Sequence, residues 1–289
     1  MNWLDEADII ISDQWMVSGI EVMGTTPGMC WVANVQTKQM GLFKPETRWR
    51  ESAYCEYAAS KIALALNIPS ARVLVGELFG FVGCISLDVR AGVSEHALAA
   101  ESLYRCGGLL ELRNATDGEA SYSEPEEMSF EGLLPYLPPE AELGLVKMMF
   151  FDCISENTGR HESNYMFTVD ANRAISAMLP LYDNGICFQS VSGSVGSLIG
   201  SDGDAGRGRG GRGRRPWFMR DGSSFPYYGE GGFHTSFPFD ELYALMRRDY
   251  PELIGELVAR IRSDEFRAAA SKLGCYEFII ERLNRFEQV

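Results

Sequence analysis

The sequence predicts an α+β protein with a strand-rich first part, crossed by one helix, and a mostly helical second part. Short runs of β-branched, aromatic and other apolar residues recur through about the first 90 residues, as is typical of strands. Beyond Ser94 longer helical patterns dominate. A chain of 289 residues can form two lobes around a cleft, and we expect a first lobe over 1–90 and a second over 91–289.

The expected strands of the first lobe are short and are separated by turns. A polar Gln-Thr-Lys-Gln stretch follows Asn34 and predicts a hairpin between the second and third strands. In chain order the strands are Trp15–Val22, Met29–Val35, Met40–Phe43 and two runs within residues 71–89 that break around Gly76 and Gly80. The segment from Asp88 to Gly92 is expected to join the lobes.

One helix is expected inside the first lobe, in the sequence RESAYCEYAASKIALALNIP. Its apolar residues follow the three- and four-residue spacing of an amphipathic helix. They are Tyr54, Tyr57, Ala58, Ile62 and Ala65. Asn67 and Pro69 are expected to end the helix.

The pattern is helical from Ser94 onward, and a long helix is expected at Pro138–Glu156, whose crowded apolar residues are typical of a buried helix. Two short strands, Tyr165–Val169 and Ala177–Tyr182, follow it. Residues from about 189 to 232 are rich in Gly, Ser and Arg and predict a flexible loop. Two or three helices are expected between Asp240 and Glu287.

Composition and charge argue against several classes of protein. The net charge of −14 disfavours attraction to nucleic acid or to an anionic membrane. Seven scattered cysteines without a Cys-x-x-Cys pair favour reduced thiols over a disulfide framework or a zinc site. The N-terminus lacks a signal-peptide pattern, and no apolar run reaches the ~18 residues that span a bilayer. We therefore expect a cytoplasmic protein that is not inserted in a membrane.

The most informative stretch is NTGRHESN, residues 157–164, which precedes two strands and then Asp183-Asn184-Gly185. This order places Asn164 and Asp183 at the ends of neighbouring strands, where they offer an amide oxygen and a carboxylate. Mg²⁺ binds through such oxygens together with substrate phosphates. Gly185 would let the chain turn away after the ligand. The alternative is that both residues only cap turns, but their pairing and their neighbours favour the metal site.

A second candidate pair lies in the first lobe. Lys44 ends an expected strand, and Glu56 lies on the helix that follows. In two-lobed phosphotransferases a strand lysine contacts nucleotide phosphates and a helix glutamate holds that lysine. The alternative, an exposed lysine without a role, is disfavoured by the order of the elements. Gly24 and Gly28 lie in a turn whose N–H groups would suit phosphates, although a plain hairpin turn explains them as well.

These stretches resemble the HipA-like kinases of bacteria, which share a kinase fold with the phosphatidylinositol 3- and 4-kinases. The similarity covers about residues 18–188. It rests on LFKPETRWRESAYCEYAASKIALALNIP, MMFFDCISENTGRHESNYMF and LPLYDNGICF. The resemblance implies a two-lobed, protein-kinase-like fold with ATP and Mg²⁺ bound between a β-rich lobe and a helical lobe.

The resemblance also implies roles for individual residues. Lys44 would bind ATP phosphates and Glu56 would pair with Lys44. Asn164 and Asp183 would hold Mg²⁺. The backbone between Ser86 and Val89, including Asp88, would meet the adenine.

One position departs from the family pattern. The family's loop reads Asp-Arg-His-x-x-Asn, and here Gly159, Arg160, His161 and Asn164 occupy those places. The carboxylate that orients or deprotonates the attacking hydroxyl is therefore missing. General-base assistance contributes ~10²–10⁴-fold in rate, so a slow enzyme would remain without it. His161 is suited to accept the proton; the alternative is that it only maintains the shape of the loop.

An arginine-rich stretch follows Asp183. Residues 206–215, GRGRGGRGRR, contain five arginines in an otherwise acidic chain. Such arginines would suit a phosphorylated or acidic substrate or nucleic acid. We favour the simpler interpretation of a solvated loop.

The sequence thus favours an ATP- and Mg²⁺-dependent kinase that phosphorylates Ser or Thr hydroxyls of a protein substrate or of itself. One alternative is a pseudokinase that binds nucleotide and acts as a regulatory or interaction module. Another is a phosphoinositide or small-molecule kinase, although the absence of a membrane anchor argues against a lipid substrate. The resemblance also makes an antitoxin-like partner conceivable, and no residue of the chain identifies the substrate.

Overall fold

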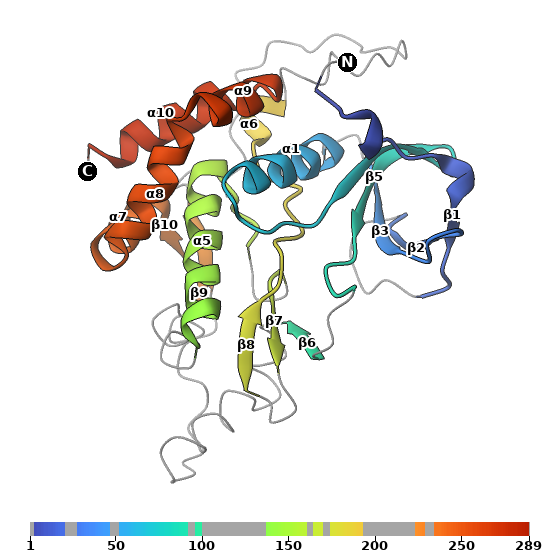
Figure 1. The fold of residues 1–289 in the computed structure, drawn as a ribbon, viewed down its shortest axis with the longest axis horizontal. Helices are drawn as coiled ribbons and strands as arrows, with labels where there is room; N and C mark the ends of the chain where they lie inside the picture. Colours follow the sequence, from blue (N-terminus) through green and yellow to red (C-terminus); the bar gives the residue numbers. More distant parts are fainter. Residues whose placement is uncertain are drawn as a thin grey trace.

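The structure is a computed structural model, which describes residues 3–20, 28–46, 52–91, 96–99, 137–160, 164–169, 174–192, 223–228 and 234–288. Figure 1 shows a sheet made by the first part of the chain and a group of helices made by its last part, with one helix, α1, between them. The predicted α+β class is confirmed by this mixed architecture.

The first part of the chain folds into a five-stranded sheet in the order β1-β2-β3-β5-β4, in which all neighbours are antiparallel. Its strands are β1 (Trp15–Val17), β2 (Cys30–Asn34), β3 (Met40–Pro45), β4 (Val73–Leu78) and β5 (Phe81–Leu87). Two single 3₁₀ turns, Glu6–Asp8 and Ser12–Gln14, precede them. The predicted hairpin between β2 and β3 is confirmed. The Asn34 side-chain oxygen stabilises its turn by accepting hydrogen bonds from the backbone N–H groups of Gln36 and Thr37, both at 3.0 Å.

Two strand predictions need correction. The first strand ends at Val17 and does not continue to Val22. The predicted break at Gly80 is confirmed, since the chain turns at Phe79 and Gly80, which both have positive φ, as in a type I′ hairpin. The predicted break at Gly76 is wrong, because Gly76 lies inside β4. Gly76 has a different task, because a Cβ added there would lie 3.0 Å from the Cβ of Ile10. The glycine therefore lets the N-terminal segment lie against β4.

Helix α1 (Ser52–Ala65) connects β3 to β4 and packs against the β3, β4 and β5 side of the sheet. It was predicted to be amphipathic, but it is buried on nearly all sides, and Leu64 is its one exposed large apolar residue. The reason is that its second face packs against the C-terminal helices, an arrangement visible in Figure 1. Asn67 ends the helix with a left-handed backbone, φ 58°, as its sequence position predicted.

The second part of the chain begins with β6 (His96–Ala99), which pairs with β7 (Met166–Val169), and β7 pairs with β8 (Ile175–Met178). Helix α5 (Pro139–Ser155) packs against β8 and agrees with the predicted helix. The predicted strand Ala177–Tyr182 was placed too late, because β8 ends at Met178, just before Pro180, which has no N–H for a ladder. The strand β6 was not predicted at all.

The C-terminal region holds four helices, where two or three were predicted. They are α7 (Phe239–Asp249), α8 (Pro251–Ile261), α9 (Asp264–Lys272) and α10 (Tyr276–Phe286). Parts of the predicted 189–232 loop are regular, namely α6 (Gln189–Ser192) and β9 (Ser223–Tyr228), which pairs with β10 (His234–Pro238). The arginine-rich residues 206–215 lie outside the described residues.

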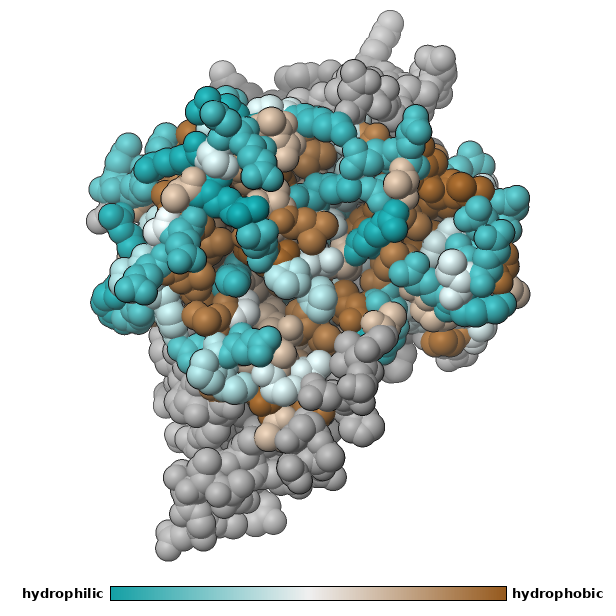
Figure 2. All heavy atoms as spheres, viewed as in Figure 1, coloured by the Kyte–Doolittle hydropathy of each residue, from teal (hydrophilic) through white to brown (hydrophobic). Residues whose placement is uncertain are grey.

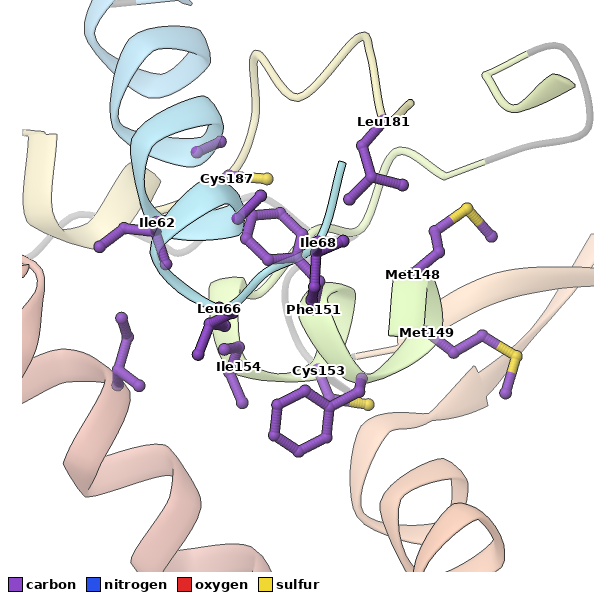
Figure 3. Close-up of a cluster of buried hydrophobic side chains, with 14 of the residues drawn as sticks. Ile62, Leu66, Ile68, Met148, Met149, Phe151, Cys153, Ile154, Leu181 and Cys187 are labelled. Atoms are coloured by element: carbon purple, nitrogen blue, oxygen red, sulfur yellow. The ribbon is translucent and has the colours of Figure 1, made fainter. Parts of the chain in front are cut away.

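Two apolar clusters hold these elements together. The smaller lies on one face of the sheet and contains Trp15, Val32, Phe43 and Ile85. The larger joins α1, α5, the segment after β8 and the C-terminal helices. Figure 3 shows its centre, where labelled side chains of α1 and α5 meet Leu181 and Cys187. Most of this cluster is formed by residues far apart in sequence.

Figure 2 shows hydrophobic residues lying between hydrophilic ones on both sides of this face of the molecule. The exposed large apolar side chains of the N-terminal segment and sheet are Ile9, Ile11, Met16, Val17, Ile20, Val35, Phe79, Phe81 and Val82. None of the helices described has the length and apolarity that crossing a bilayer requires.

The N-terminal segment is fixed to the back of α1 by ion pairs. Asp8 is buried and binds Lys61 of α1 at 2.6 Å and Arg72 at 2.9 Å. Asp5 binds Lys61 at 2.9 Å and Lys272 of α9 at 2.7 Å. These hydrogen-bonded pairs lower the pKa of Asp5 from 3.8 to about 2. The segment therefore links α1 to the C-terminal helices.

Replacing Asp5 by Asn is expected to lower the melting temperature at pH 7 by about 2–4 °C. The side chain is 45% exposed, so screening limits the two ion pairs to about 1 kcal/mol in total. Because the folded-state pKa lies below its ordinary value, this stabilisation is present above about pH 4 and disappears as the pH falls to about 2. Melting curves of the two proteins should therefore converge over that range. Asp13→Asn, an exposed aspartate in the same segment, is the matched control; a gap that is independent of pH would contradict the assignment to the Asp5 charge.

Candidate functional site

The side chain of Lys44, in strand β3, lies on the face of the sheet that packs against α1. Successive residues of a strand point to opposite faces, and Phe43 belongs to the apolar cluster on the far face. Lys44 is therefore directed toward α1, where it is buried and forms a salt bridge with Glu56. Its ammonium group also lies 2.6 Å from Oδ1 of Asp183. The predicted lysine and glutamate thus meet, and the predicted metal aspartate, 139 residues from Lys44 in sequence, joins them.

Glu56 uses both carboxylate oxygens. Oε1 pairs with Lys44, and Oε2 accepts a hydrogen bond of 3.0 Å from the backbone N–H of Asn184. The side chain is 1% exposed. A buried carboxylate needs such partners to remain charged. Glu56 consequently fixes α1 to strand β3 on one side and to the segment that follows β8 on the other.

The charge of Lys44 is secured by its neighbours. Burial alone would lower the pKa of its ammonium group, but the carboxylates of Glu56 and Asp183 outweigh burial and raise that pKa well above its ordinary value. Lys44 therefore stays protonated at any physiological pH. It offers a fixed positive charge of the kind that binds phosphate oxygens.

Asp183 has an unusual backbone and an accessible side chain. Its φ is 54°, in the left-handed region, which asparagine and aspartate tolerate better than most residues. The side chain is 43% exposed although Oδ1 pairs with Lys44. Strained residues of this kind cluster at functional sites. Asp183 combines a carboxylate open to solvent with a backbone held by its surroundings.

Arg160 lies at the centre of the loop that precedes β7. It is fully buried, and all five of its N–H groups have partners. Its donors bind both oxygens of Asp152 at 3.0 Å, Oδ1 of Asn184 at 2.7 Å, and the backbone carbonyls of Asn164 and Tyr182 at 2.8 and 2.9 Å. The arginine thereby ties α5, the loop and the segment around Asp183 into one network.

Asp152 is the buried counterion of Arg160. It is fully buried, and it also accepts a hydrogen bond of 2.9 Å from the side chain of Asn157. Burial raises the pKa of its carboxyl group, and the attraction of Arg160 opposes that shift. Glu156, the other acidic residue near the loop, pairs with Arg282 at 3.2 Å. Asp152 was not predicted as a functional residue, because nothing in its spacing identifies the arginine eight positions later as its partner.

Asn164 and Gly159 face each other across the loop. The Asn164 side-chain N–H donates to the Gly159 carbonyl at 3.0 Å. The Gly159 N–H in turn donates to the side-chain oxygen of Asn157 at 3.1 Å. Within the described part of the chain, no hydrogen bond to the amide oxygen of Asn164 is found. His161 lies outside the described residues.

The residues predicted to meet adenine lie at the end of β5. Ser86 is buried in the strand, opposite Leu42 and Val73. The Asp88 carboxylate is bound by Arg90, whose guanidinium lies 5.3 Å from the Trp31 ring. The Asp88 side chain is therefore engaged within the protein, and the prediction rests on the backbone of this segment.

Of the two glycines predicted to face phosphates, the structure describes Gly28. Gly28 has a φ of 84°, and a Cβ added there would lie 3.1 Å from Cγ of Pro45, at the end of β3. Gly28 thus lies beside the end of the strand that carries Lys44. Gly24 lies outside the described residues.

The chemistry of the oxygen ligands fits magnesium. Asn164 and Asp183 offer hard oxygen atoms, and Mg²⁺ commonly binds one or two such ligands together with phosphates and water. In the described ranges no three His, Cys, Asp or Glu side chains are grouped to hold a metal ion by themselves. The bound nucleotide would have to complete any such site.

No protein-family model and no curated protein sequence matches this chain. Solved structures do match. The Helicobacter pylori proinflammatory kinase CtkA superimposes with a TM-score of 0.54 over 93% of both chains, at 13% sequence identity. HipA from Shewanella oneidensis MR-1, solved with HipB and operator DNA, matches with a TM-score of 0.40 at 14% identity, over 99% of this chain and 66% of that chain. The similarity to CtkA shows that this chain has a kinase fold, in agreement with its sequence resemblance to the HipA-like kinases.

Proposed function

We propose that this protein is an ATP- and Mg²⁺-dependent kinase of the HipA-like type that phosphorylates Ser or Thr hydroxyls of a protein substrate or of itself. The observation that carries the proposal is the meeting of Lys44, Glu56 and Asp183 in one ion-pair group, in which Lys44 and Glu56 are buried and Asp183 remains accessible to solvent. Phosphoryl transfer in two-lobed kinases uses a strand lysine, a helix glutamate and a metal-binding aspartate in this arrangement. The kinase fold supports it independently.

In this proposal each side chain acts on the triphosphate. Lys44, kept charged and oriented by Glu56, would bind phosphate oxygens. Asn164 and Asp183 would hold Mg²⁺, which would supply positive charge to neutralise the phosphates. The backbone between Ser86 and Val89 receives the adenine. Arg160 has no donor left for a substrate, so we assign it the positioning of Asn164 and Asp183.

The reaction joins the substrate hydroxyl oxygen to the γ-phosphorus and breaks the bond from that phosphorus to the bridging oxygen, so ADP leaves. The hydroxyl proton needs an acceptor, and Gly159 supplies none. We propose His161 for this role. Positioning and electrostatic stabilisation carry most of the catalysis in such reactions, and the missing carboxylate is expected to lower the rate by about 10²–10⁴-fold.

A pseudokinase is the second candidate, and the bare backbone at Gly159 favours it. Such a protein would keep the ion-pair group and bind nucleotide without transferring phosphate. The antitoxin-like partner and the cytoplasmic location remain predictions that rest on the resemblance and on composition.

The test compares the unmodified protein with Lys44→Met in two measurements. With γ-labelled ATP and Mg²⁺, the unmodified protein should label itself or a generic protein substrate, and Lys44→Met should not. ATP at about 100 times its Kd should raise the melting temperature by about 5–10 °C only when Lys44 is present. Lys61→Met, which also removes an ion-paired lysine, is the matched control. ATP stabilisation without label transfer would favour the pseudokinase, and the absence of both would refute a nucleotide site.

A further inference from the structure

The backbone conformation at position 159 does not require glycine. The φ of Gly159 lies outside the left-handed region that favours glycine. Its N–H and C=O groups are both engaged, with the side chains of Asn157 and Asn164. These hydrogen bonds hold the backbone in place, so a side chain introduced at this position would have to find room without a backbone shift.

That room is occupied by Ile186. A Cβ added to Gly159 would meet Cδ1 of Ile186 at a separation well inside 3.0 Å, and Cγ1 at 3.1 Å. The turn that carries Ile186 is itself anchored, because the Cys187 N–H donates to the Asn184 carbonyl at 3.0 Å and the Phe188 N–H donates to the Ser155 carbonyl at 2.9 Å. Cys187 and Phe188 are both fully buried. Rotation of the Ile186 side chain is therefore the least costly way to make space.

We propose that Ile186 excludes a carboxylate from position 159, so that Gly159 and Ile186 form a coupled pair. The isoleucine, three residues after Asp183, places an apolar side chain over the position where the family has its aspartate. With Ile186 in place, an aspartate at position 159 would be strained, and its carboxylate would point away from the substrate hydroxyl. Removing the Ile186 δ-carbon as well would let the carboxylate reach its place. The steric part of this inference is independent of activity, whereas the catalytic part rests on the proposed function.

The steric part is tested by thermal melting of Gly159→Ala, Ile186→Val and the double variant. Valine lacks the δ-carbon and retains the rest of the contact surface. Gly159→Ala should melt roughly 2–4 °C below the unmodified protein, because the partly buried Ile186 side chain must leave its rotamer at a cost of about 1 kcal/mol. In the Ile186→Val background the same change should cost at most about half as much. An equal loss in both backgrounds, or no loss in either, would overturn the coupling.

The catalytic part uses Gly159→Asp with and without Ile186→Val, and measures transfer of the γ-phosphate. The double variant should transfer phosphate about tenfold faster than Gly159→Asp, or faster still, as a correctly placed general base allows. Equal rates in the two proteins would show that Ile186 does not exclude a working carboxylate. If no variant transfers phosphate, the proposed function fails, and the melting experiment still decides whether the two positions are sterically coupled.

Discussion

Replacing Arg160 by Met is expected to destabilise the protein by about 3–5 kcal/mol, the usual cost of leaving a buried charge without its partner. The substitution leaves the fully buried Asp152 carboxylate with only the Asn157 side chain, and it removes the donors to Asn184 and to two backbone carbonyls. The melting temperature should fall by roughly 6–15 °C. Urea unfolding followed by circular dichroism would measure the loss in free energy.

The pH dependence of this variant provides an internal check. Burial already raises the pKa of Asp152 above 3.8, and removing Arg160 should raise it further. A carboxyl group with a raised folded-state pKa destabilises the fold at high pH, and that penalty is relieved as the pH falls through the raised value. The deficit of Arg160→Met should thus be smaller at pH 5 than at pH 7.5. In the double variant with Asp152→Asn, the part of the deficit that comes from the unpaired carboxylate should disappear, so the double variant should lose less stability than the sum of the two single variants. A loss equal to that sum would show that the ion pair is not the cause.

Replacing Asp183 by Asn is expected to reduce γ-phosphate transfer by roughly 10³-fold or more. Removing a carboxylate ligand takes away several kcal/mol of stabilisation of the developing charge. The fold should survive, because asparagine tolerates the left-handed backbone at this position and Lys44 keeps its pair with Glu56. Melting curves should therefore agree within about 2 °C while the transfer of label is lost.

Asp249→Asn is the matched control for Asp183→Asn. Asp249 is also a partly exposed aspartate, and it pairs with Arg248 at 2.6 Å on α7. Its replacement should leave transfer unchanged. If Asp183→Asn transferred phosphate at the full rate, Asp183 would not be a ligand of the proposed metal site. A large fall in the melting temperature of this variant would indicate a structural role for Asp183 instead.

The order of motifs made one part of the site predictable. Lys44, Glu56 and Asp183 are charged residues, and each follows or lies on an element whose pattern is visible in the sequence. A two-lobed kinase fold places these three residues at one site. In the structure Lys44 forms ion pairs with both Glu56 and Asp183. The ends of strands were less predictable: β1 ends at Val17 and β8 at Met178, and both were predicted to end later.

The supporting network could not be predicted in the same way. Arginine is mostly exposed in proteins, so an arginine in a loop suggests contact with a substrate. Only the three-dimensional structure shows that Arg160 lies beside Asp152, across a helix end where no periodicity relates the two. The contact between Gly159 and Ile186 depends on two loops 27 positions apart and leaves no trace in composition or spacing.

The placement of α1 has a consequence for the order in which the chain can mature during synthesis. Helix α1 shares its apolar cluster with α5 and the C-terminal helices, and the Tyr54 hydroxyl donates to the Leu273 carbonyl at the end of α9. A nascent chain that has emerged only as far as β5 would carry this helix with much of its apolar surface uncovered. The second partner of Glu56, the Asn184 N–H, would still be missing from such a chain. The ion-pair group could therefore form only after the segment that carries Asp183 and Asn184 has emerged.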